Sequence, residues 1–517
     1  MEATTLLPLL GLLLVLPFFL LLKLVAPAGK PPPRPRLPPG PWQLPLIGSL
    51  HHLLLSRHGN LAHRTLRDLS RRHGPLMLLR LGSVPTLVVS SAEAAREVLK
   101  THDAAFASRH LTPTLAVFSV GGRDVLFSPY GDLWRHLRRL CTLELLSARR
   151  VRSFRRVRED EAARLLRSVA AAGGGDVDVG EWMCRAVNDA VTRAAVGGRC
   201  ARRDEFLREL QNAVALTGGF NVADMYPASR VARRLSGALR DAERCNRAVR
   251  EIMAEIIREQ EKLSAAGDGG RDEDDGDNLL AVLLRLQREG DAECPLTTDI
   301  ISTVVLEIFA AGSETSSTTL EWALSELTRN PRVMQKAQAE IREAFKGKHK
   351  LAEADTEKLR YLPLVLKETL RLHVPVPFLL PRECREPCTV LGYDIPIGTK
   401  VLVNAWAIAR DERHWGEDAE EFVPERFERP EAVDFRGADF EFLPFGAGRR
   451  MCPGMALGLV NMELALAGLL YHFDWEEVPE GEKKLDDGDG VGEAFGITVK
   501  RKNRLVLRAT PRIPCAY

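Results

Sequence analysis

The sequence has almost no excess of charge of either sign. Its 517 residues carry 72 Lys and Arg against 70 Asp and Glu, a formal net charge of +2. A surface so near balance gives no reason to expect a nucleic-acid partner or a broadly acidic one. Internal repeats and long Gly/Ser linkers are also lacking, although the length alone would suggest several domains. Hydrophobic residues make up 45% of the chain, which is enough for the core of one large body.

Paired cysteines are scarce as well. The nine cysteines are odd in number and scattered from Cys141 to Cys515. Cys384 and Cys388 lie four residues apart, but no second cysteine pair or His-x-x-x-His run lies near them, so a zinc site is not expected. Scattered cysteines of this kind are typical of a reducing compartment in which thiols stay free.

One of these cysteines lies in a loop of glycines and prolines near the C-terminus, and a long apolar run follows it. Glycine lets the backbone adopt positive φ or approach another group closely, and proline fixes the exit towards a helix. Backbone amides that point at a thiolate tune its charge. The alternative is a buried structural cysteine in a tight turn. The residues that define the loop are Phe445, Gly448, Arg450, Cys452 and Gly454.

These five positions resemble the haem-ligand loop of the cytochrome P-450 superfamily, the haem-thiolate monooxygenases. The resemblance implies that the loop binds haem b and that Cys452 is the ligand to its iron. It also implies a mainly α fold with a small β-rich region, in which a long central helix lies over the haem. The cofactor would supply the oxidative chemistry, and the protein would position and protect it.

The longest predicted helix runs from Leu296 to Arg329. Its middle, residues 311–319, is rich in small and hydroxylated side chains, which are poor choices for a helix interior and often mark function. A seam for packing against another helix is the alternative. The stretch resembles the oxygen-binding motif of the family, which implies that Ala311 lies against the haem and that Glu314 and Thr315 relay protons to dioxygen.

Two further patterns concern arginines. Trp134 and Arg138 are four residues apart and therefore share a helix face. They resemble the Trp-x-x-x-Arg motif of the family, which implies that they hold a haem propionate, with Arg382 and Arg450 as further propionate partners. A guanidinium suits a carboxylate because its charge is permanent and its donors form a fork. A basic surface helix with one tryptophan is the alternative reading of the first pair.

A predicted helix from Tyr361 to His373 places Glu368 and Arg371 on one face. The pair resembles the Glu-x-x-Arg motif of the family, and Arg426 would complete a buried triad. Buried charges are costly unless they are fully paired. We therefore expect the triad to be a structural lock on the cysteine loop rather than a catalytic group.

Ala3 to Leu22 contains no charged residue and is long enough to span a bilayer as a helix. Basic residues follow it, so the positive-inside rule places the body of the protein in the cytosol. A cleaved secretion signal is the alternative, but Glu2 and the absence of a basic residue at the front end argue against it. We expect residues 1–23 to be an uncleaved membrane anchor.

Residues 24–48 are dense in proline, which enforces an extended, stiff segment. We expect a hinge here that orients the catalytic domain, residues 49–517. The resemblance implies a single-pass protein of the endoplasmic reticulum membrane with its catalytic domain on the cytosolic side.

Hydrophobic periodicity predicts the remaining elements. A hairpin is expected early in the body, a long loop after it, and short strands towards the end. The resemblance implies that this loop roofs the substrate pocket. These predictions cover a hairpin at 75–81 and 84–89, a helix at 92–101, a loop at 106–130, helices between 147 and 261, strands at 388–391, 393–395 and 400–403, and a terminal strand ending near Leu507.

The predicted pocket is apolar, so the substrate is expected to be a lipophilic small molecule. The stretches 311–327 and 449–475 resemble the plant microsomal A-type clan, and a sesqui- or diterpenoid is the expected substrate. A phenolic, flavonoid or alkaloid is an alternative; so is a haem-thiolate isomerase or dehydratase, or a non-catalytic haem-binding protein. The pocket residues are Phe118, Val304, Ala311, Val376, Phe378, Leu379 and Phe495.

The resemblance also names the partners. NADPH would deliver electrons through a membrane-bound flavoprotein reductase, with cytochrome b5 as an additional donor. Dioxygen would be the second substrate, and membrane lipid would surround the anchor.

Overall fold

The computed structural model describes the chain from residue 35 onward, apart from short gaps. The predicted anchor, residues 1–23, lies outside the described residues, as does the first part of the predicted hinge, residues 24–34. The described residues are 35–199, 202–218, 220–265, 278–290, 295–348, 350–429, 431–478 and 492–515.

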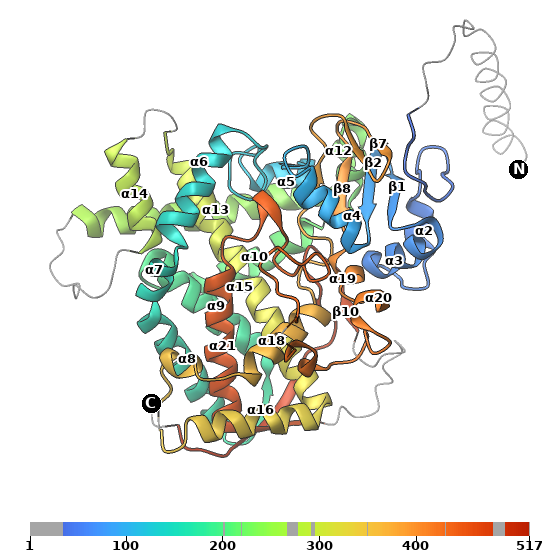
Figure 1. Ribbon diagram of the computed structural model, residues 1–517. Helices are drawn as coiled ribbons and strands as arrows, with labels where there is room; N and C mark the ends of the chain where they lie inside the picture. The colour runs from blue at the N-terminus through green and yellow to red at the C-terminus, as the bar shows by residue number, and fades with distance from the viewer. Residues whose placement is uncertain are drawn as a thin grey trace, which may run out of the picture.

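One helix, α15 (Thr298–Arg329), runs through the middle of the helical part of the molecule (Figure 1). Thr297 begins it by accepting a hydrogen bond from the Ile300 amide at 3.3 Å, which satisfies one of the unpaired donors of the first turn. The helix packs against α9 (Val179–Val196) and α21 (Met455–His472). Neighbours on several sides explain why α15 has no single apolar face.

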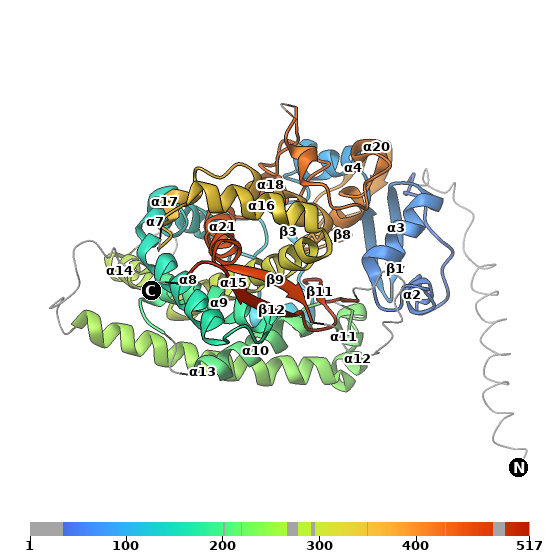
Figure 2. The ribbon, with the colours of Figure 1, turned by 90° about the horizontal axis from the view of Figure 1, so that it is seen from below.

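The other helices surround α15 or cover the strands. Figure 2 shows α13 on the side of the helical part opposite α16. The remaining α-helices are α2 (Leu50–Leu54), α3 (Ala62–His73), α4 (Ala92–Arg96), α5 (Pro113–Phe118), α6 (Asp132–Leu140), α7 (Ala148–Ser153), α8 (Arg155–Ala171), α10 (Arg203–Leu216), α11 (Val222–Met225), α12 (Arg230–Leu235), α13 (Gly237–Ala265), α14 (Leu279–Glu289), α16 (Pro331–Ala344), α17 (Glu353–Thr356), α18 (Tyr361–Leu372), α19 (Ala405–Ile408) and α20 (Glu412–Trp415).

The largest sheet lies at one side of the helices (Figure 1), whereas β9 and β12 lie among the helices beside α8 and α15 (Figure 2). The largest sheet has the order β1-β2-β8-β5-β3, in which β2 and β8 are parallel and the other neighbours antiparallel. Three smaller sheets pair β4-β12-β9, β6-β7 and β10-β11. The strands are β1 (Leu76–Leu81), β2 (Val84–Val89), β3 (Ser108–Arg109), β4 (Asp176–Asp178), β5 (Arg382–Glu383), β6 (Cys388–Val390), β7 (Tyr393–Ile395), β8 (Lys400–Val403), β9 (Phe473–Glu477), β10 (Glu493–Ala494), β11 (Lys500–Arg501) and β12 (Val506–Pro511).

The largest hydrophobic core lies between α15, α9, α8 and α21. Among the described residues, Met455–His472 is the one helix apolar and long enough to cross a membrane. Most of its side chains are buried inside the protein, so it is a core helix of the fold.

The predicted mainly α fold, with a small β-rich region and a long central helix, is confirmed. The hairpin at 75–81 and 84–89 is present, with Leu81 opposite Val84. The strands predicted at 393–395 and 400–403 are found at those bounds. These segments carry strong local patterns, and such patterns predict elements well.

Three local predictions were wrong in part. The segment 106–130 is not all loop, because Thr112 accepts from the Leu115 amide and the proline after it begins α5. The predicted helix 92–101 changes after Arg96 into a π-helical turn, η1 (Glu97–Thr101). The terminal strand continues past Leu507 to Pro511, since residues 507–511 pair with β9.

Candidate active site

The loop from 445 to 454 is closed by a hydrogen bond from the Cys452 amide to the Phe445 carbonyl at 3.0 Å. Gly446 and Gly448 both have a φ of 68°, which favours glycine. A Cβ on Gly448 would lie 2.2 Å from the Leu99 carbonyl oxygen, so no other residue fits there. The backbone of the loop therefore packs tightly against η1. The Cys452 thiol remains uncovered by this contact.

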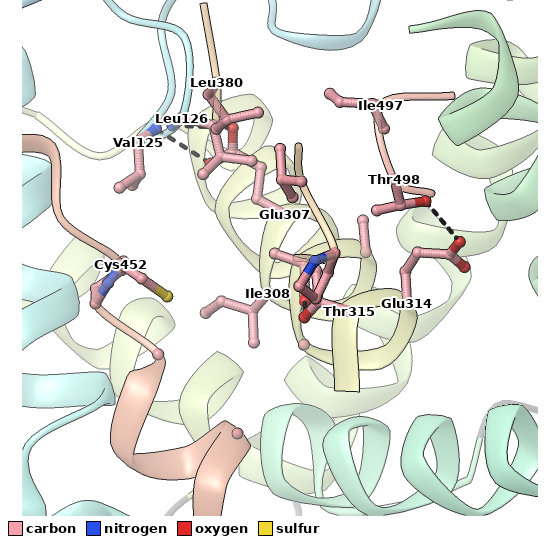
Figure 3. A pocket seen from close by; sticks show the side chains of 18 of the residues that line it. Val125, Leu126, Glu307, Ile308, Glu314, Thr315, Leu380, Cys452, Ile497 and Thr498 are labelled. Atoms are coloured by element: carbon pink, nitrogen blue, oxygen red, sulfur yellow. Dashed lines mark hydrogen bonds between the residues drawn. The ribbon is translucent and has the colours of Figure 1, made fainter. Parts of the chain in front are cut away.

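The Cys452 thiol faces an internal cavity of about 360 Å³ and lies across it from Ile308 and Thr315 of α15 (Figure 3). Burial raises its pKa, whereas hydrogen bonds from the Gly454 amide, the charge of Arg138 and the Met455 amide act in the opposite direction. These amides belong to the first turn of α21, where unpaired N–H groups and the helix dipole favour an anion. Burial prevails, so the loop presents a thiol, and these donors and Arg138 would stabilise the thiolate form of that sulfur as a metal ligand.

Four arginines converge on the same cavity from four different segments. They are Arg109, Arg138, Arg382 and Arg450, and all four line it. Burial and then the charge of Arg382 lower the pKa of Arg450 to about 9. Burial and the charges of the other three lower the pKa of Arg109 well below its usual value.

The acidic groups that act on these arginines are Asp103 and Asp124. Four guanidinium groups against two carboxylates leave two positive charges beside the cavity. Buried cations in excess are costly unless an anionic group pairs with them. A haem carries an iron and two propionates, and the residues at the cavity fit both. The thiol can bind the iron, and the two uncompensated positive charges can pair with the propionates.

The predicted propionate partners make other hydrogen bonds within the protein. Trp134 Nε1 donates to the Val125 carbonyl at 3.1 Å, and the Arg138 guanidinium donates to the Met451 carbonyl at 2.6 Å. Arg382 donates to the Ala447 carbonyl at 2.8 Å and forms an ion pair with Asp103 at 3.1 Å. These contacts fix each side chain at the rim of the cavity.

On the opposite side of the cavity, Thr315 Oγ1 donates to the Ala311 carbonyl at 2.7 Å. Its neighbour Glu314 points away from Cys452 (Figure 3). The Glu314 carboxylate accepts from Thr498 Oγ1 at 3.1 Å and forms an ion pair with Lys500 at 2.5 Å. The two predicted relay groups are adjacent in sequence but face different surroundings.

Glu314 also lines a second cavity, of about 840 Å³, between α15, α9 and the β11 segment. Charged and polar side chains dominate its lining, among them Glu321 and Arg501. Burial raises the pKa of Glu321 to about 7. Glu314 therefore lies between the thiol cavity and a polar region that can hold water.

The thiol cavity is otherwise largely apolar. Of the predicted pocket residues, Phe118, Val304, Ala311, Val376 and Leu379 line it. Phe378 and Phe495 do not belong to its lining; their rings contact each other, with centroids 5.9 Å apart, in a neighbouring core cluster. Ile497 and Thr498 line the cavity in place of Phe495, because the turn after β10 directs the later residues inwards.

The predicted triad is brought together by the fold. Arg371 Nε donates to Glu368 Oε2 at 2.7 Å, and Arg426 Nε donates to Glu368 Oε1 at 2.9 Å. Glu368 and Arg371 are fully buried. Arg371 also donates to the Ala409 and Ala419 carbonyls, each at 2.7 Å.

Sequence reasoning missed two carboxyl groups at the cavity, Glu307 and Asp124, and also Arg109. Glu307 accepts from the Val125 and Leu126 amides at 3.1 and 3.2 Å (Figure 3). A charged residue inside an otherwise apolar stretch of the long helix was the signal that could have identified Glu307, since buried acids usually have a partner.

The fold and the thiol site define a haem-thiolate protein, and the comparisons identify its family. The family model described as Cytochrome P450 matches residues 38–506. The chain belongs to the cytochrome P450 family.

Several plant proteins are similar to the chain over nearly its whole length. Zealexin A1 synthase of Zea mays is 50% identical over 485 residues, covering 93% of this chain and 94% of that protein. Ent-cassadiene hydroxylase of Oryza sativa subsp. japonica is 52% identical over 496 residues, covering 94% of each. Among solved structures, a zebra fish cytochrome P450 with abiraterone matches with a TM-score of 0.72 and 27% identity, covering 87% of this chain and 99% of that one.

Membership of the family establishes the enzyme class and the cofactor. The protein is a cytochrome P450 monooxygenase. It uses haem b, and its electrons come from NADPH through a reductase. When bound, the haem supplies the oxygen chemistry, and the residues described above bind it, exclude water and hold protons.

Proposed function

We propose that the protein hydroxylates or otherwise oxidises a terpenoid, with a sesqui- or diterpenoid as the substrate. The observation that carries this proposal is the apolar lining of the cavity between Cys452 and α15. A hydrocarbon skeleton gains free energy by leaving water for such a cavity, in proportion to the apolar area that it buries.

The names of similar proteins support the substrate class. Besides the two relatives described above, dolabradiene monooxygenase of Zea mays is 49% identical and premnaspirodiene oxygenase of Hyoscyamus muticus is 46% identical. Desmethyl-deoxy-podophyllotoxin synthase of Sinopodophyllum hexandrum is also 46% identical and is named for a different compound. The test therefore includes substrates other than terpenoids.

The residues take the following roles in the proposal. Cys452 is the ligand to the haem iron, and the loop glycines Gly448 and Gly454 let the backbone approach it. Arg138, Arg382 and Arg450 pair with the propionates, since their charges exceed those of the neighbouring carboxylates. Trp134 and Phe445 complete the cradle at the rim of the cavity.

Thr315 and Glu314 deliver protons on the opposite side of the cavity. The hydroxyl oxygen of Thr315 faces the cavity, and the hydroxyl proton is donated in a hydrogen bond to the Ala311 carbonyl. Glu314 connects the thiol cavity with the polar cavity through Thr498 and Lys500. A carboxylate in such a place can collect protons from water and pass them on, which is the task of a general acid.

The proposal places the protein on the cytosolic side of the endoplasmic reticulum membrane, with residues 1–23 as anchor, 24–48 as hinge and 49–517 as catalytic domain. Exposed apolar side chains near the start of the described chain support a lipid contact. Tyr226 at the end of α11 donates to the Leu46 carbonyl at 3.3 Å, so α11 and α12 share this face. The exposed residues are Trp42, Leu46, Leu54, Leu55, Val222, Val231 and Leu235. The partners in this setting are the membrane-bound reductase and cytochrome b5.

The test is reconstitution of the full-length protein with a plant NADPH reductase in lipid nanodiscs. Pools of sesquiterpenes, diterpenes, phenolics and alkaloids are supplied separately, and products are identified by mass spectrometry. NADPH-dependent oxygenated terpenes are the expected result. Products from the phenolic or alkaloid pool alone, with an intact haem spectrum, would refute the terpenoid substrate.

A further inference from the structure

Glu307 lies on α15, one turn before Ala311, on the side that faces the cavity. Its two carboxyl oxygens accept from consecutive backbone amides, Val125 to Oε2 and Leu126 to Oε1 (Figure 3). Val125 and Leu126 line the same cavity together with their neighbours Asp124 and Phe127, and Ser128 follows directly after them. We call residues 124–128 the roof segment; Glu307 fastens it to the central helix.

Asp124 begins the roof segment and is fully buried. Its Oδ1 accepts from the Phe127 and Ser128 amides at 2.6 and 2.9 Å. Its Oδ2 is buried and has no donor among the described residues, and its carboxyl group is in contact with that of Glu307. Two carboxylates have no proton to share, so this contact is a hydrogen bond only if one of them is a neutral acid.

The other side of the roof segment faces the arginines of the propionate cluster. The Val125 carbonyl accepts from Trp134 Nε1 at 3.1 Å and from Arg450 at 3.4 Å. The Leu126 carbonyl accepts from Arg109 Nε at 3.1 Å. The Val125 and Leu126 amides therefore point to α15 and their carbonyls to the cation cluster, so the position of the roof segment depends on both.

We propose that Glu307 is a positioning residue that, as a neutral acid sharing its proton with Asp124, holds the roof segment on α15 and so shapes the cavity for a bulky lipophilic ligand. Loss of that proton places two negative charges against each other in a buried site. Like charges at hydrogen-bonding distance repel strongly at low dielectric. The roof segment then separates from α15, and the cavity loses its fit for a bulky ligand.

The surroundings of Glu307 and Asp124 determine the pH range over which the fastening of the roof segment is lost. Burial, and then the charge of Asp124, raise the pKa of Glu307 well above its usual value. Glu307 therefore keeps its proton to a higher pH than an ordinary glutamate does, and the fastening is lost as the pH rises through the raised pKa. The groups that face the pair from neighbouring segments are Arg109, Arg138, Cys141 and Arg450.

The test compares two iron-binding probes on the haem-loaded full chain. Clotrimazole is bulky and must fit below the roof segment, whereas imidazole is small and reports only on the iron. For the wild type, we expect the clotrimazole affinity to fall about tenfold over a series from about pH 6 to about pH 10, while the affinity for imidazole, calculated for its neutral form, stays constant. Hydrogen exchange at the Val125 and Leu126 amides should accelerate over the same range.

Two substitutions at position 307 separate the proposal from a general packing role. Glu307→Gln keeps one oxygen to accept from the Val125 or the Leu126 amide and has an N–H donor for Asp124 that does not titrate. Clotrimazole should therefore bind more tightly to Glu307→Gln than to Glu307→Leu at neutral pH, without the fall at high pH. Glu307→Leu should bind clotrimazole weakly at every pH. Glu463→Gln is the matched control, because burial raises the pKa of Glu463 to about 7 but it does not line the cavity; it should behave as the wild type.

The proposal is overturned if the wild-type affinity for clotrimazole is independent of pH, or if Glu307→Gln keeps the full pH dependence. It is equally overturned if Glu307→Gln binds as weakly as Glu307→Leu. Should Glu307→Leu fail to load haem, the wild-type pH series and Glu307→Gln still decide the question.

Discussion

Glu368 and Arg426 lie 58 residues apart in sequence and are joined by a hydrogen bond of 2.9 Å in the interior. The same Glu368 oxygen accepts from the Val423 amide at 2.8 Å. The other oxygen accepts from Arg371 Nε at 2.7 Å. Glu368 therefore ties α18 to the segment that leads to the thiol loop, and this connection positions the loop from behind.

Glu368→Gln should destabilise the protein by about 3–5 kcal/mol, because it leaves the buried Arg371 without a charged partner and Arg426 with Asp418 alone, at 3.3 Å. Chemical denaturation of the haem-loaded protein measures the change. Glu428→Gln is the control, since Glu428 pairs with Lys336 at the surface, and it should cost less than about 1 kcal/mol. Equal losses in the two variants would contradict the structural role of the triad.

Cys452→Ala should abolish the red-shifted Soret band that carbon monoxide gives with a reduced thiolate-ligated haem. The substitution removes the one side chain that the loop presents to the cavity as a metal ligand, while the loop hydrogen bond to Phe445 is made by the backbone and stays. Difference spectroscopy makes the measurement. Cys141→Ala is the control; Cys141 is buried, and burial raises the pKa of its thiol to about 12, so the band should remain. A band in Cys452→Ala would refute the proposed ligand.

Thr315→Ala should leave haem binding intact and uncouple NADPH consumption from product formation. The product formed per NADPH should fall about tenfold or more, because a positioned proton donor is worth about 10²–10⁴ in rate. Thr328→Ala is the matched control: Thr328 donates to the Leu324 carbonyl in the same way, at 3.0 Å, but lies in the last turn of α15. Unchanged coupling in Thr315→Ala would refute the proton relay.

Glu425 predicts a pH dependence of stability. Hydrogen bonds from Arg332, and next to them Tyr361, outweigh burial and lower the pKa of Glu425 to about 2. A lowered pKa stabilises the fold above the usual value for a glutamate, and this contribution is lost as the pH falls towards about 2.

Glu425→Gln should therefore cost about 1 kcal/mol at neutral pH, since the partly exposed site is screened by solvent. The difference from the wild type should shrink between about pH 5 and pH 3. Urea denaturation at several pH values measures it. A difference that stays constant, or grows in acid, would contradict the assigned cause.

The amino-acid sequence by itself determined the main secondary-structure elements and the candidate role of the Cys452 thiol as a metal ligand. The Gly-rich loop around Cys452 and the long helix that carries Thr315 were predictable because their patterns are local. A glycine at positive φ or a run of small residues within a helix has the same meaning in any fold. The spacing of Glu368 and Arg371 was equally visible, since i,i+3 neighbours share a helix face.

Only the tertiary structure decided which side chains meet across long separations. In the folded protein Glu307 lies beside Asp124, and Glu314 forms an ion pair with Lys500. Phe378 lies outside the cavity that its neighbours in sequence line. Each of these outcomes depends on the rotation and spacing of elements packed against one another, and a rotation of a few tens of degrees moves a side chain from a cavity into the core. Local periodicity carries no information about that rotation, because it is set by the packing of all the neighbouring side chains at once.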